Sequence, residues 1–154
     1  ERLRANGIMK IGLYSQIARQ NIANAREEIV KKGYTSSPDD IRRYREETMS
    51  MDTKSDPETS MFTRTNDFST LSECRDLLFH VQEHRFTLPK IEQALDNLNL
   101  KFLGFQLSQH WIKRNFKNFY PDEDSLTSLS SWNQFELKNP NTFRGMYQFW
   151  VQKL

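Results

Sequence analysis

The sequence has 154 residues, 22 of them basic and 20 acidic, so its formal net charge of +2 gives no support for nucleic-acid binding by charge. Its 36% of apolar residues and mean hydropathy of -0.79 are low for a compact domain, and no apolar run approaches the roughly 20 residues of a membrane span. The single cysteine, Cys74, excludes an internal disulfide and fits a reducing compartment. We therefore expect a cytoplasmic protein that binds neither nucleic acid nor membrane.

A helix end and a short strand are predicted first along the chain. Asn6-Gly7 is typical of residues that end a helix, and residues 8–13 have the composition of a short buried strand. A chain that opens on the last turn of a helix, without an initiator methionine or a signal peptide, is expected to be a fragment of a longer polypeptide. Ser15 is placed to cap a helix that runs to about Lys32 and ends at Gly33.

Two more helices are predicted before residue 80. Ser37-Pro38-Asp39-Asp40 combines a capping serine, a proline and two acids, and it predicts a charged helix to about Met49. The segment 50–67 shows no hydrophobic period and predicts an exposed loop. Thr70 is placed to cap a short helix through Leu78.

The stretch 79–107 is the most informative part of the sequence. A polar His/Glu/His cluster precedes a helix in which Thr87 is placed as the cap and Pro89 lies in the first turn, and an apolar strand follows at 100–107. If the strands 8–13 and 100–107 lie side by side and parallel, the polar cluster falls at the edge where strands end. Open α/β sheets bind their ligands at that edge.

Two helices and a third strand are predicted for the rest of the chain. Residues 109–120 form an amphipathic pattern that Pro121 ends, and a short apolar period from Leu129 to Glu136 precedes Asn139-Pro140. Residues 146–152 alternate in the manner of a strand.

The predicted fold class is therefore α/β. It consists of two parallel strands and a final strand that runs antiparallel to 100–107. The predicted helical insertions, at about 15–86 and 108–145, would leave from the carboxyl ends of the parallel strands and cap the substrate edge.

Five residues are expected at this edge as substrate-binding candidates: Tyr14, His80, Glu83, His84 and Arg85. A histidine whose pKa lies near neutrality can take a proton from an attacking nucleophile, and Glu83 would fix the orientation of the ring. The alternative is that these residues only join two structural elements, and that Ser15 only caps the helix after it. No catalytic residue is assigned.

The residues His80-Val81-Gln82-Glu83-His84 also match H-x-x-E-H, a zinc-protease motif in which one helix presents two histidines to the metal. Arg85 to Pro89 begin a new element at once, which leaves little helix to hold such ligands, and a match at three positions in five arises readily by chance. We therefore expect no metal, and a zinc hydrolase is only a minor alternative.

Aromatic residues at helical or strand spacing are assigned to the core rather than to a pocket. They are Trp111, Phe116, Phe119, Trp132, Phe135 and Trp150. Cys74 has no CxxC or paired-histidine context and is expected to be buried. Basic residues from Lys113 to Lys117 are followed by the acidic residues 122–124, which favours a solvated helix face over a nucleic-acid site.

Several motifs together carry a resemblance to a known family. The turn and strand at 3–11 loosely match a Leu-x-Pro-Gly-Gly turn with its strand, residues 98–105 match a helix end with an apolar strand, and Phe149-Trp150-Val151-Gln152-Lys153 matches a closing strand. In this order they resemble the second half of a class I S-adenosylmethionine-dependent methyltransferase, with its Rossmann-like sheet. More narrowly, GLYS, CRDLLFHVQEHRFTLP and NPNTFRGMYQFWVQK resemble bacterial methyltransferase-like proteins that often carry tetratricopeptide repeats upstream.

This resemblance implies methyl transfer from S-adenosylmethionine to an unidentified acceptor, with the substrate-side contacts in this chain and the cofactor site in a missing N-terminal half of the domain. The family's glycine-rich loop and acidic ribose-binding residue would lie before Glu1, and the five glycines form no G-x-G-x-x-G. No cofactor-binding residue is therefore assigned, and the chain alone is expected to be inactive. The alternative from another class is a non-catalytic module that binds a protein partner.

Overall fold

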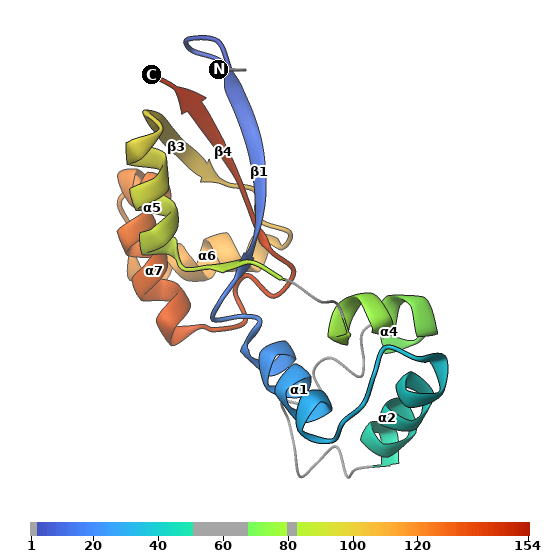
Figure 1. Cartoon of the computed structure of the whole chain (residues 1–154). Helices are drawn as coiled ribbons and strands as arrows, with labels where there is room; N and C mark the ends of the chain where they lie inside the picture. Colours follow the sequence, from blue (N-terminus) through green and yellow to red (C-terminus); the bar gives the residue numbers. More distant parts are fainter. Residues whose placement is uncertain (1–2, 51–67, 80–82) are drawn as a thin grey trace. The chain divides into compact units, whose positions relative to one another are not determined.

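The computed structural model describes residues 3–50, 68–79 and 83–154 (Figure 1). The chain divides into two compact units. The sheet unit comprises Glu1–Arg19 and His84–Leu154, and the helical unit comprises Gln20–Glu83. Each unit has its own hydrophobic core, and each is described separately below.

The sheet unit contains a mixed four-stranded sheet in the order β2-β1-β4-β3. Its strands are β1 (Ile8–Ser15), β2 (Arg85–Phe86), β3 (Leu100–Phe105) and β4 (Tyr147–Lys153). β2 is parallel to β1, whereas β4 is antiparallel to both β1 and β3. The fold of the described residues is thus mixed α/β, as the sequence predicts.

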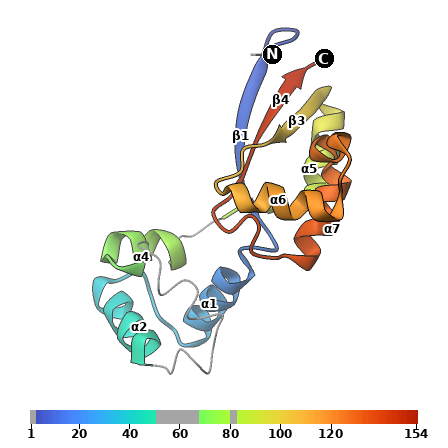
Figure 2. The same cartoon turned by 180° about the vertical axis from the view of Figure 1, so that it is seen from behind.

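The three predicted strands are confirmed, and so is the antiparallel pairing of the last strand with β3. The prediction that strands 8–13 and 100–107 lie side by side is wrong, because β4 lies between them (Figures 1 and 2). β1 and β3 run in the same direction because each is antiparallel to the same strand. β2 was not predicted, since two residues are too few to show any alternation.

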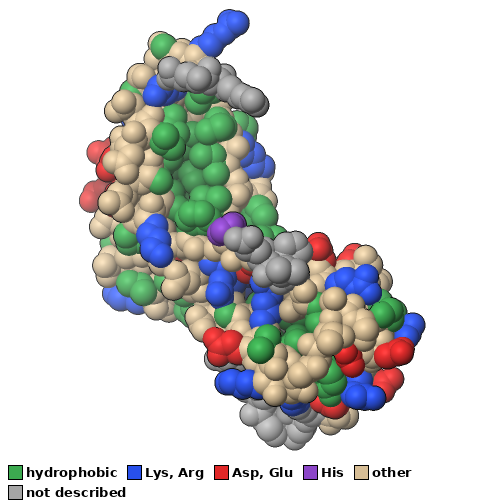
Figure 3. Space-filling model, viewed as in Figure 1, with side chains coloured by type: hydrophobic (Ala, Val, Ile, Leu, Met, Phe, Trp, Pro, Cys, Tyr) green, Lys and Arg blue, Asp and Glu red, His purple; other side chains and the backbone are tan. Residues whose placement is uncertain are grey.

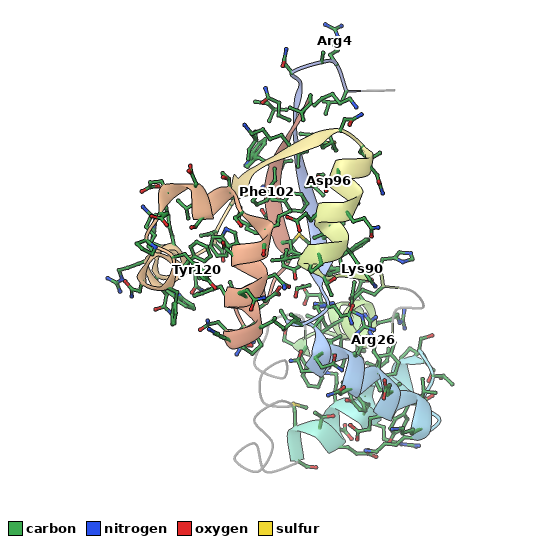
Figure 4. The ribbon with its side chains drawn as sticks, turned by 90° about the vertical axis from the view of Figure 1, so that its left-hand side faces the viewer. Arg4, Arg26, Lys90, Asp96, Phe102 and Tyr120 are labelled. Atoms are coloured by element: carbon green, nitrogen blue, oxygen red, sulfur yellow. The ribbon has the colours of Figure 1, made fainter. Side chains whose placement is uncertain are left out.

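The helices of the sheet unit are α5 (Leu88–Asn97), α6 (His110–Phe119) and α7 (Leu129–Lys138), with a 3-10 turn at Glu123–Thr127. Figure 4 looks from the helix side and shows α5 and α7 in front of β1 and β4. α5 buries Leu88, Ile91 and Leu95, which share one face at helical spacing. Thr87 occupies the predicted cap position, but its side chain makes no capping hydrogen bond.

Aromatic rings fill the core between the helices and the sheet. Phe116 stacks on Trp132 with ring centroids 3.7 Å apart, and both side chains are buried together with Phe135. The core assignment is wrong for Trp111, Phe119 and Trp150, which are 49%, 56% and 41% exposed. α6 turns only the side that bears Ile112 and Phe116 into the core, and Trp150 alternates with the buried Phe149 along β4.

The helical unit contains α1 (Gln20–Lys31), α2 (Pro38–Ser50) and α4 (Leu71–Leu78). The predicted capping residue Thr70 accepts a hydrogen bond from the backbone N–H of Glu73 at 3.2 Å, and Gly33 has the positive φ of 73° that a helix end favours. The predicted loop 50–67 lies, apart from Ser50, outside the described residues.

The chain before β1 differs from the prediction. Residues 3–7 form a turn rather than the end of a helix, with the N–H of Gly7 donating to the carbonyl of Arg4 at 2.8 Å. Asn6 has a φ of 61°, and its N–H donates to the carbonyl of Lys153 at 2.9 Å. The Asn-Gly pair therefore starts the β1–β4 pairing. Within the described ranges, no helix has the length and apolarity needed to cross a bilayer.

Cys74 is buried, as predicted, and burial raises the pKa of its thiol to about 11. We therefore expect Ellman's reagent to label the folded protein very slowly at about pH 8, because the thiolate that reacts is scarce and shielded. Since Cys74 is the only cysteine, the labelling rate reports on the helical unit alone. In urea the same thiol should react at the rate of a small free thiol, and rapid labelling of the folded protein would contradict the prediction.

Candidate functional site

The carboxyl ends of two parallel strands meet at the end of β1. Tyr14 and Ser15 are the register partners of Arg85 and Phe86, and the N–H of Gln16 donates to the carbonyl of Phe86 at 2.8 Å. The chain leaves the sheet unit just after β1 and returns to it just before β2. The structure thus brings two predicted candidates, Tyr14 and Arg85, together at the kind of sheet edge where ligands bind.

Tyr14 and Arg85 project from the same face of the sheet, because register partners in paired strands share a face. Arg19 adds a third side chain, its guanidinium carbon lying 4.3 Å from the centroid of the Tyr14 ring. This is a cation–π contact. The backbone of Arg19 is fixed by donation from its N–H to the carbonyl of Ser15 at 3.2 Å. We call Tyr14, Arg19 and Arg85 the basic–aromatic edge.

The opposite face at the same place holds a buried polar cluster of Ser15, Glu136 and Tyr147. The hydroxyl of Ser15 donates to Glu136 Oε1 at 2.5 Å, and the hydroxyl of Tyr147 donates to Glu136 Oε2 at 2.6 Å. All three residues are 0% exposed. The cluster therefore joins the end of β1, helix α7 and the start of β4.

Burial raises the pKa of the Glu136 carboxyl, and the two donated hydrogen bonds only partly oppose that effect. Burial also raises the pKa of the Tyr147 hydroxyl, and the nearby carboxylate adds to the rise. A serine beside a carboxylate but without an imidazole is not an activated nucleophile, and a cluster with no exposed surface cannot receive a substrate. The buried polar cluster is consequently a structural clamp at the base of the candidate site.

Sequence reasoning missed this cluster, although one signal was present. Glu136 lies on the apolar period of α7, beside Phe135, where an acid is unusual and needs partners. Ser15 was interpreted as a helix cap. Its Oγ does accept a hydrogen bond from the N–H of Ala18 at 3.0 Å, but α1 begins only at Gln20, so Ser15 caps the turn that leads to the helix.

The other three predicted candidates, Glu83, His84 and His80, are not grouped with Tyr14 and Arg85 in the described structure. Glu83 belongs to the helical unit, where its Oε2 lies 3.2 Å from Nη2 of Arg26, a residue that also donates to the carbonyl of Leu77 at 2.7 Å. Figure 4 labels Arg26 on α1. His84 is exposed and directly precedes β2, while His80 lies outside the described residues. Glu83 is thus held by an arginine within the helical unit.

The H-x-x-E-H motif falls partly outside the described residues, since these omit 80–82. Its last two residues, Glu83 and His84, lie in no helix. Among the residues that the structure describes, no three His, Cys, Asp or Glu side chains are grouped so that they could hold a metal ion. The described part of the motif therefore lacks the helical frame that such a zinc site uses.

Comparison with known proteins does not place the chain in a family. A scan against protein-family models finds no match. A search of curated protein sequences finds no match either.

Proposed function

We propose that this chain supplies the substrate side of a class I methyltransferase-like domain, which transfers a methyl group from S-adenosylmethionine to an acceptor that is still to be identified. The observation that carries the proposal is the pairing of Tyr14 with Arg85 where parallel strands end. Two strands in one direction, β1 and β3, and a final aromatic strand against them, β4, are the elements that the resemblance implies.

The charge at this edge favours an acceptor that carries a negative group. Arg85 is half-buried at this edge as the register partner of Tyr14, and the exposed His84 adjoins it in the chain, whereas Arg19, over the Tyr14 ring, is only 9% exposed. The carboxylate of Glu136 lies on the other face and is fully buried. A guanidinium binds carboxylate or phosphate oxygens through paired hydrogen bonds. We therefore propose a carboxylate- or phosphate-bearing acceptor.

The cofactor residues have to lie outside this sequence, because its 154 residues contain no glycine-rich phosphate or adenosyl loop. In the proposal they belong to polypeptide that precedes Glu1. The side chains of the present chain then bind and orient the acceptor, while bound S-adenosylmethionine supplies the activated methyl group.

The proposal predicts that a longer polypeptide, which includes the segment before Glu1, binds S-adenosylmethionine with about one site per chain in isothermal titration calorimetry. The present chain alone should show no heat of binding, since it lacks the cofactor loop. Arg85→Ala in the longer polypeptide should leave this affinity within about two-fold, because Arg85 is assigned to the acceptor and not to the cofactor.

S-adenosylhomocysteine, the product of any such transfer, should compete in the same titration. A longer polypeptide that folds but binds neither compound contradicts methyl transfer. In that case the non-catalytic protein-interaction module is the better account.

A further inference from the structure

Two hydrogen bonds close the turn that follows β1, and both are accepted by Ser15. Its hydroxyl oxygen accepts from the N–H of Ala18 at 3.0 Å, and its carbonyl accepts from the N–H of Arg19 at 3.2 Å. Ala18 and Arg19 are both buried, so the turn is packed as well as hydrogen-bonded. Ser15 therefore connects the end of the strand with the residue that lies over the Tyr14 ring.

Glu136 fixes the orientation of the Ser15 hydroxyl. A serine side chain has three staggered rotamers, and its hydroxyl donates one hydrogen bond while it can accept two. In Ser15 the hydroxyl donates to Glu136 Oε1 at 2.5 Å and accepts from the turn. Both residues are 0% exposed, so bulk water does not compete for the hydroxyl. The carboxylate of Glu136 thus selects the rotamer in which Ser15 also holds the turn.

The contact between Arg19 and Tyr14 is the part of the candidate site that this turn controls. With the guanidinium carbon 4.3 Å from the ring centroid, the attraction between the two restricts the torsions of Tyr14. Figure 3 shows hydrophobic side chains gathered between α5 and β1, which offer an anionic group no ionic contact. Such a group is better bound at the carboxyl end of β1, where Arg85 is the register partner of Tyr14.

We propose that Glu136 and Ser15 are positioning residues for the candidate site. Acting through the turn after β1, they hold Arg19 over Tyr14 and so set the ring that an acceptor meets beside Arg85. The role of Tyr14 and Arg85 as acceptor contacts rests on the proposed function. The positioning itself depends only on contacts within the sheet unit of the present chain.

The NMR signal of the Arg19 side chain tests this positioning in the present chain. A proton that lies over an aromatic ring resonates at lower frequency than the same proton in a free arginine, so the Nε–H signal of Arg19 reports on its contact with Tyr14. Arg19→Lys identifies the signal by removing it. Ser15→Ala should move the signal to the position of an arginine in an unfolded peptide. It should also speed the hydrogen exchange of the Ala18 amide by about 10-fold or more.

Tyr147→Phe is the matched control, because it removes the other hydrogen bond to the same carboxylate, the one donated to Oε2 from β4. Like Ser15→Ala, it should lower the urea concentration at which the sheet unit unfolds. It should nevertheless leave the Arg19 signal in place and the exchange rate of Ala18 within about two-fold. A general loosening of the fold would change both variants alike, so equal shifts overturn the proposal. An unmoved Arg19 signal in Ser15→Ala also overturns it.

Two substitutions of nearly unchanged size test the part played by Glu136. Glu136→Gln keeps an oxygen that can accept from Ser15 and should retain the Arg19 signal. Glu136→Met has no such oxygen and should move the signal as far as Ser15→Ala does. An unmoved signal in Glu136→Met would show that Ser15 holds the turn unaided, which overturns the role of Glu136.

Two measurements verify that the variants and the unmodified protein support this comparison. The amides of Phe149 and Val151 lie in the central strand β4 and should stay protected in every variant that folds. The unmodified protein should show nuclear Overhauser effects between the Arg19 side chain and the Tyr14 ring. Their absence overturns the proposal even if no variant folds.

The calorimetry described above separates this proposal from the methyltransferase proposal, because the NMR measurements use neither S-adenosylmethionine nor an acceptor. A displaced Arg19 signal in Ser15→Ala, without S-adenosylmethionine binding by the longer polypeptide, supports the positioning and contradicts the activity. S-adenosylmethionine binding together with an unmoved Arg19 signal supports the activity and overturns the positioning.

Discussion

Replacing Glu136 with alanine is expected to lower the free energy of unfolding of the sheet unit by about 2–4 kcal/mol. The carboxylate accepts hydrogen bonds from Ser15 at 2.5 Å and from Tyr147 at 2.6 Å, with all three residues fully buried. Alanine leaves both hydroxyls without this acceptor and also leaves a cavity between α7 and the sheet. Glu136→Gln keeps the shape and one acceptor oxygen, so its loss should be about 1 kcal/mol.

Urea unfolding followed by tryptophan fluorescence measures this difference, because all three tryptophans lie in the sheet unit. Glu92→Ala, at an exposed position on α5, is the control and should change the free energy of unfolding by no more than about 0.5 kcal/mol. Equal effects of the two alanine variants would show that the buried polar cluster does not stabilise the fold.

The raised pKa of Glu136 also predicts how the free energy of unfolding changes with pH. Burial raises the pKa of Glu136 above its ordinary value of 4.5, so over the interval above 4.5 the folded state holds this proton more tightly than the unfolded state. Its contribution to stability is therefore greatest below 4.5 and is lost as the pH rises toward the raised pKa. The stability of the unmodified protein relative to Glu136→Gln should fall as the pH rises above about 4.5, and a constant difference would contradict the assignment.

Trp132→Ala is expected to be the most damaging substitution in the sheet unit, with a loss of about 3–5 kcal/mol. The Trp132 ring stacks on Phe116 with centroids 3.7 Å apart, packs edge-on against Phe105, and its indole N–H donates to the carbonyl of Leu126 at 3.0 Å. Alanine removes the largest fully buried side chain of the chain's described part.

Trp111→Ala supplies the matched control, since Trp111 is 49% exposed on α6 and its removal should cost less than about 1 kcal/mol. Thermal unfolding followed by circular dichroism compares the two variants without depending on tryptophan emission. Similar melting temperatures for both would place Trp132 outside the cooperative core.

Local signals explain which elements could be predicted. Thr70 caps α4, Pro38 begins α2 and Gly33 ends α1, because capping and chain reversal depend on residues only a few positions apart. The apolar periods of α5 and α7 likewise located their helices. The hydrophobic period of a helix does not predict how exposed each single residue is. The assignment of Trp111 and Phe119 to the core was therefore wrong.

The candidate site was predictable only in part. The expectation that substrate-binding residues lie where parallel strands end identified Tyr14 and Arg85 as candidates, and the structure pairs these two residues. It did not lead to Arg19, whose contact with Tyr14 depends on the turn after β1, nor to Glu136, whose partner Ser15 is 121 residues away in the sequence. Such contacts have no periodic signature that a single sequence can show.

The sequence by itself located the described α-helices and three of the four described strands, and it determined that the last strand runs antiparallel to the strand at 100–105. Only the tertiary structure decided that β4 separates β1 from β3 and that a two-residue strand joins β1 on its other side. The physical reason is the distance along the sequence between the groups that form hydrogen bonds. Helices and turns close hydrogen bonds between near neighbours, whereas strand order depends on backbone groups more than 130 residues apart, such as those of Leu13 and Tyr147.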